Sequence, residues 1–149
     1  MFRRLLCAVL CGCATVLLAA DASLARFDHV TVAPAKTSIY IGSVTMSFAP
    51  ATRQAGVYET SYNAKVFPYF FMSEKGRVAL HAPDETLQKL ARGEAVDFSG
   101  TGVSSDGATR RFEGRATPDD TRSGKLKVHV YVSKRIDLIF NMTYRFGPP

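Results

Sequence analysis

The stretch KLKVHVYVSKRIDLIFNMTYRF (residues 125–146) alternates between apolar and polar side chains almost without interruption. Successive side chains of a β-strand point to opposite faces, so this period of two predicts two half-buried strands that face one core. Ser133-Lys134 between them leaves room only for a tight turn, which favours an antiparallel hairpin. The inward side chains expected from the alternation are Leu126, Val128, Val130 and Val132, then Ile136, Leu138, Phe140, Met142, Tyr144 and Phe146.

The same period of two recurs along most of the chain, in short runs separated by turn residues. This pattern predicts a mostly β protein, a small antiparallel β-sandwich or barrel of about 8–9 strands. The strands are expected at residues 29–33, 38–48 with or without a break at Gly42, 57–66, 68–73, 76–82, 95–103, 109–117, 125–133 and 135–146.

One short helix is expected at about residues 83–92. Pro83 and two acidic residues mark its start, and Gly93 follows its end. Leu87, Leu90 and Ala91 form its only apolar stripe, so the helix should lie across a sheet or plug one end of a barrel.

A second hairpin turns at Ser105-Asp106-Gly107-Ala108. Pairing Ser105 with Thr109 around a three-residue loop, with Gly107 at positive φ, places Phe98 opposite Ala116 on an apolar face. A slip of one residue would instead bring Phe98 opposite Arg115, so we expect the three-residue loop.

Residues 66–72 are apolar on both faces of a predicted strand. Pro68 cannot donate a ladder hydrogen bond, so this strand should lie at a sheet edge or begin there. An apolar edge needs cover from the helix, from another chain or from a ligand. The candidate partner edge, which would also serve a homo-oligomer, consists of Phe67, Tyr69, Phe70, Phe71 and Met72.

The N-terminal segment has the pattern of a secretory signal peptide. Arg3 and Arg4 precede an apolar run at residues 5–20, and Ser23-Leu24-Ala25 forms a small-x-small cleavage site. The run of 16 residues is shorter than the roughly 18–20 that a membrane-spanning helix needs. We therefore expect a signal peptide at residues 1–25, export to the periplasm or the exterior, and a single β-rich domain at residues 26–149.

All three cysteines, Cys7, Cys11 and Cys13, lie inside that segment, so the exported chain should contain no thiol or disulfide. A lipoprotein with an acylated Cys13 is the alternative. It is disfavoured because Cys11 stands where Ala or Ser is usual and because the residues after Cys13 stay apolar.

The sequence offers no recognisable catalytic or metal-binding pattern. His29, His81 and His129 are isolated on separate predicted strands, and no serine lies in a nucleophile-elbow motif. We therefore expect a protein that is not an enzyme and that has no catalytic residues, metal or cofactor.

The excess of positive charge lies in the C-terminal third, where residues 107–149 carry nine basic residues against four acidic ones. Outward positions of three predicted strands supply a candidate basic face, which consists of Arg111, Arg115, Lys125, Lys127, His129, Tyr131 and Arg145. Such a face favours an exported, non-catalytic domain that binds an anionic lipid or glycan, and nucleic acid is a weak candidate because only Tyr131 could stack on bases. The alternatives are a structural protein that pairs through the aromatic edge and a small outer-membrane barrel.

Overall fold

The computed structural model describes residues 24–148. The three cysteines lie outside the described residues, and so does the predicted signal peptide except for its last two residues, 24 and 25. The described elements are η1 (Ala25–Phe27), β1 (His29–Val32), β2 (Ala35–Ile39), β3 (Gly42–Phe48), β4 (Ala51–Gln54), β5 (Val57–Phe67), η2 (Phe70–Met72), β6 (Glu74–His81), α2 (Asp84–Ala91), β7 (Val96–Ser104), β8 (Thr109–Pro118), β9 (Ser123–Ser133) and β10 (Ile136–Phe146).

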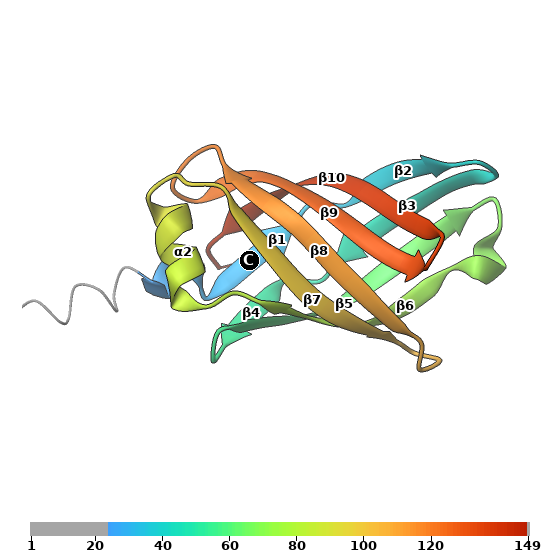
Figure 1. Cartoon of the computed structure of the whole chain (residues 1–149), viewed down its shortest axis with the longest axis horizontal. Coiled ribbons are helices and arrows are strands. Elements are labelled where there is room, and N and C mark those ends of the chain that lie inside the picture. Colours follow the sequence, from blue (N-terminus) through green and yellow to red (C-terminus); the bar gives the residue numbers. More distant parts are fainter. Residues whose placement is uncertain (1–23, 149) are drawn as a thin grey trace, which may run out of the picture.

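The strands form one closed antiparallel barrel, which decides between the sandwich and the barrel expected from the sequence (Figure 1). Closure comes from β1, which pairs with β10 on one side and with β4 on the other. Strands β5 to β10 follow as a meander, each antiparallel to the next, and the extra hairpin of β2 and β3 is attached through the pairing of β3 with β5. The prediction of a mostly β protein with one helix is confirmed.

Two prolines divide what would otherwise be long strands. Ala33 donates its N–H to the carbonyl of Thr143 at 2.9 Å, and the next residue, Pro34, has no N–H to continue the ladder with β10. Pro50 likewise separates β3 from β4. Of the two alternatives for residues 38–48, the structure has the break at Gly42, because β2 ends at Ile39, β3 begins at Gly42 and the two strands form a hairpin.

The helix α2 closes one end of the barrel (Figure 1). Its apolar stripe supplies Leu87 and Leu90, which are buried in the same cluster as Phe27, Tyr58 and Phe146. Arg53 fixes the start of the helix, because its guanidinium pairs with the Asp84 carboxylate at 2.5 Å and donates to the carbonyl of Ala82 at 3.1 Å. The helix expected at residues 83–92 is thus confirmed as a plug of a barrel end.

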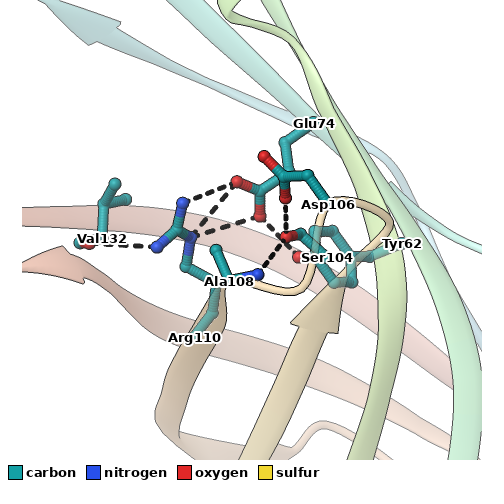
Figure 2. Close-up of polar contacts among 7 residues, drawn as sticks. All are labelled: Tyr62, Glu74, Ser104, Asp106, Ala108, Arg110 and Val132. Carbon is teal, nitrogen blue, oxygen red and sulfur yellow. Dashed lines mark hydrogen bonds and ion pairs between the residues drawn. The ribbon is translucent and has the colours of Figure 1, made fainter.

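A polar cluster lies at the opposite end (Figure 2). Arg110 lies two residues before Phe112 on β8 and therefore on the same, inward face. Its guanidinium pairs with the Glu74 carboxylate at 2.7 Å. The Tyr62 hydroxyl donates to the same carboxylate at 2.5 Å. Ser104 donates to Asp106, and this contact holds the Asp106 pKa below its usual value. Ionic and hydrogen-bonded groups thus fill this mouth of the barrel, while the rest of the interior is apolar.

The β9–β10 hairpin follows the predicted alternation. Val128 and Val130 of β9 and Phe140 and Met142 of β10 are buried, and Val130 faces Leu138. Ile136 is the exception, because the ladder is irregular between Ile136 and Asp137 and leaves its side chain 51% exposed.

The β7–β8 hairpin has the predicted faces but a different register. Val103 faces Thr109, and Phe98 lies opposite Gly114, two residues away from the predicted partner Ala116. The loop spans residues 104–108, and Gly107 has φ of 89°, the positive value expected.

The strand expected at residues 68–73 is wrong. β5 ends at Phe67, η2 follows, and β6 begins at Glu74. β5 pairs with β3 and β4 on one side and with β6 on the other, but the ladder with β6 ends at Ala64, so residues 65–67 pair only with β3.

Candidate functional site

The seven residues of the predicted basic face lie on three neighbouring strands. Arg111 and Arg115 lie on β8, Lys125, Lys127, His129 and Tyr131 on β9, and Arg145 on β10. The ladders place Arg111 opposite Tyr131 and Arg115 opposite Lys127. The fold therefore brings these side chains onto one outer surface of the barrel.

Acidic residues neutralise the part of this surface that is remote from α2. Glu113 pairs with Arg111 at 3.3 Å and accepts a hydrogen bond from the Tyr131 hydroxyl at 3.2 Å. The Arg111 guanidinium lies 4.1 Å from the centroid of the Tyr131 ring. Asp137 lies 3.0 Å from His129 Nδ1. This half of the face is a mixed-charge network.

The half nearer α2 has three basic side chains, Arg115, Lys125 and Lys127, of which Arg115 is paired with an acid. Arg115 and Lys127 are directly opposite each other, an arrangement of like charges that costs stability in an antiparallel pair. Asp97 contacts Arg115 at 2.9 Å, and Lys125 follows two positions before Lys127 on the same face. Arg145 faces Ser123, beside the β8–β9 loop. In that loop the Asp120 pKa is lowered mainly by hydrogen bonds from Arg122 and Ser123, and the charge of Arg145 lowers it further. We call Arg115, Lys125 and Lys127 the cationic patch.

A groove spans both halves of this surface, with Arg115 and Lys127 as its basic residues and Asp97 and Glu113 as its acidic ones, and we call it the basic groove. Its volume is about 640 Å³. Phe98 forms part of its floor at Gly114, where a Cβ atom would lie 2.5 Å from the Phe98 ring and 2.2 Å from the Lys127 carbonyl oxygen. The lining residues are His81, Pro83, Thr86, Asp97, Phe98, Ser99, Glu113, Gly114, Arg115, Lys127, His129 and Tyr131.

Inside the barrel, beneath α2, lies an apolar cavity of about 100 Å³. Leu87 and Leu90 form its roof, and side chains such as Val96, Ala116 and Leu126 form its wall. The Tyr58 hydroxyl is occupied, because it donates to the Phe27 carbonyl at 2.5 Å, and burial raises its pKa. The cavity thus offers apolar surface to a guest.

The basic groove and the apolar cavity adjoin. His81, Thr86 and Phe98 line both spaces. Phe98 is therefore part of the wall between the groove outside the barrel and the apolar cavity inside it.

The sequence did not point to several residues of this site. Phe98 was expected on the apolar face of its hairpin, and neither Gly114 nor Thr86 was expected to contribute to a site. The signal that could have found Phe98 is Gly114 on the facing strand, since a glycine in a strand marks a place where another group approaches closely.

The predicted partner residues lie elsewhere. Phe67, Tyr69, Phe70, Phe71 and Met72 are all exposed at the end of the barrel opposite α2. They do not contribute to the groove or the cavity.

Residues 24–148 contain no group of three or more His, Cys, Asp or Glu side chains positioned to hold a metal ion. No helix in this range is long and apolar enough to span a bilayer. No protein-family model matches the chain, and a comparison with curated protein sequences found no significant match.

Proposed function

We propose that the protein is a non-catalytic carrier or receptor for an amphiphilic anion. The acidic head lies in the basic groove and the apolar tail enters the apolar cavity. The observation that carries this proposal is the shared lining of the two spaces by His81, Thr86 and Phe98. Export to the periplasm or the exterior is part of the proposal.

The cationic patch supports the anionic head. Arg115 and Lys127 lie opposite each other across the β8–β9 ladder, so an anion between them is attracted by both, in competition with Asp97 for Arg115. Ser99 and Tyr131 add hydroxyl groups to the lining of the same groove. The head is therefore a carboxylate or a phosphate ester.

The cavity supports a short tail. An apolar cavity of roughly 150 Å³ stays dry and binds benzene, so the smaller space beneath α2 fits only a few carbon atoms. Each methylene buried there contributes about 0.8 kcal/mol. A longer tail would need α2 to move outward.

The charges on the outer wall favour a barrel surrounded by water over the outer-membrane alternative. Arg111, Glu113, Arg115 and Lys127 point outward from the middle of β8 and β9. A lipid-facing wall is apolar, with polar residues inside, which is the reverse arrangement.

The proposal is tested by titrating the purified protein with straight-chain carboxylates of increasing length, using calorimetry. We expect the affinity to rise about fourfold for each added methylene until the tail fills the cavity, and then to level off. Alcohols of the same length should bind more weakly, because they lack the charged head.

The contribution of the head is isolated with the double variant Arg115→Gln and Lys127→Gln. Two partly exposed charge contacts contribute about 0.5–1 kcal/mol each, so carboxylate binding should weaken about tenfold while alcohol binding stays unchanged. The matched control is Lys134→Gln with Arg135→Gln, which removes the same charge at the other end of the barrel. Equal weakening by the control, or an affinity independent of tail length, would refute the proposal.

A further inference from the structure

Two hairpin ends lie side by side at the end of the barrel opposite α2 (Figure 1). They are the β2–β3 turn, with Tyr40 and Ile41, and the loop between β5 and β6. Ser43 pairs with Phe67, and a Cβ atom on Gly42 would lie 2.0 Å from the Phe67 carbonyl oxygen. This close approach joins the two ends into one surface, which we call the aromatic tip.

The aromatic tip exposes large apolar side chains that the fold does not use. Tyr40 is fully exposed, and Phe71 and Phe70 are 85% and 63% exposed. An exposed apolar cluster of this kind marks an interaction surface. Its members are Tyr40, Ile41, Phe67, Tyr69, Phe70, Phe71 and Met72.

The loop that carries most of these side chains is held in one conformation. Met72 and Ser73 donate their N–H groups to the carbonyls of Tyr69 and Phe70, at 3.0 and 3.1 Å. The Ser73 hydroxyl accepts a hydrogen bond from the Val66 N–H at 3.0 Å. The rings of Phe67 and Phe70 also pack edge to face, with centroids 5.8 Å apart. Docking therefore requires little further ordering of the loop.

Basic residues surround the tip. Lys36 faces Thr45, which in turn faces Lys65, so the two lysines share one outward row. Lys75 and Arg77 lie on the adjoining strand β6. Segments 35–48 and 61–77 contain only one acid, Glu74, and Arg110 neutralises it.

We propose that the aromatic tip docks the protein onto an anionic lipid bilayer. Aromatic rings and Met72 enter the headgroup region, and Lys36, Lys65, Lys75 and Arg77 contact lipid phosphates. Aromatic side chains favour the membrane–water interface, and basic residues beside them are attracted to anionic lipids. The basic residues around the tip, Lys36, Lys65, Lys75 and Arg77, favour an anionic lipid surface over a second, equally basic copy of this chain. This docking is independent of the basic groove, which lies nearer the opposite end.

The experiment uses the absence of tryptophan from the chain. Phe71→Trp places a single fluorescent reporter at the tip, and Ile139→Trp places a control reporter on the outer wall of β10, where Ile139 is 39% exposed. Both proteins are mixed with vesicles of phosphatidylcholine alone or with phosphatidylglycerol. With anionic vesicles we expect a blue shift and quenching by brominated lipid chains for Trp at position 71, and neither for Trp at position 139. Because the signal is local, binding through any other part of the chain does not imitate it.

The charge contribution is measured in the Phe71→Trp background. Lys65→Gln with Lys75→Gln should weaken partitioning onto anionic vesicles at least tenfold, since each basic residue near the surface contributes about 1 kcal/mol. The control pair is Lys89→Gln with Arg92→Gln at the α2 end, which should bind like the parent. No shift at position 71, or equal partitioning onto neutral vesicles, would overturn the proposal. A dimer in light scattering that Phe70→Ser dissociates would overturn it in favour of a second copy of the chain.

Discussion

Arg110 shows how one residue can have the right parity and still be misread from sequence. Arg110 lies on β8 two residues before Phe112 and on the same, inward face as Phe112 and Ala116, where a charged side chain is not expected. The structure turns it inward because Glu74 and Tyr62 supply partners at the barrel mouth. Glu74 lies 36 residues away in the sequence, so only the closed barrel brings the pair together.

The buried tyrosines give a prediction about alkaline pH. Burial raises the pKa of Tyr58, Tyr62 and Tyr144 above the ordinary 10.0, to about 12 for Tyr144. The hydrogen bond to Glu74 raises the Tyr62 pKa further. Since the folded state favours the protonated phenols, their stabilisation is complete below pH 10.0 and is lost as the pH rises above it.

Spectrophotometric titration combined with urea denaturation checks this expectation. Three of the six tyrosines should ionise above the ordinary range, and the denaturation midpoint should fall as the pH rises past that range. If all six ionised together while the fold stayed intact, the packing assigned to these three rings would be wrong.

At the scale of the element, alternation predicted faces better than registers. The β7–β8 ladder differs from the predicted one by two residues, a shift that keeps every side chain on its face. The observed register places Phe98 over Gly114, where the absence of a Cβ gives space to the ring. A steric fit of this kind cannot be derived from a pattern of polar and apolar residues.

The strand predicted at residues 68–73 is also wrong. Its side chains are apolar on both faces, so no alternation between a buried and an exposed face supported a strand. Only the preference of aromatic residues for strands did so. After Pro68 the backbone instead forms η2, which leaves the rings exposed.

Strand β9 provides the sharpest test of alternation. Val130 is 3% exposed and faces the core, whereas its neighbour His129 points outward and contacts Asp137. We expect Val130→Asp to abolish soluble folding, because it buries a charge without a partner. His129→Ala should cost less than about 1 kcal/mol, since it removes only a partly exposed pair.

Soluble yield and thermal denaturation of the two variants distinguish these outcomes. Similar losses in both would contradict the inward and outward assignments along β9.

At the scale of the whole molecule, the candidate site is a product of barrel closure. The sequence located Arg115, Lys127, His129 and Tyr131 on one face, and these four line the basic groove. It could not show that the apolar cavity lies behind them, because β6, α2 and β7 reach this place only when the barrel closes. The two ends of the molecule also differ, with the proposed amphiphile site near α2 and the aromatic tip opposite.

The central claim is that one ligand occupies both the groove and the cavity. A crystal structure with ω-bromohexanoate tests it directly, because the anomalous signal of bromine locates the tail. We predict bromine inside the barrel between Leu87, Val96 and Ala116, and the carboxylate within hydrogen-bond distance of Arg115 or Lys127. Bromine outside the barrel wall, or a carboxylate bound remote from both basic residues, would contradict the account.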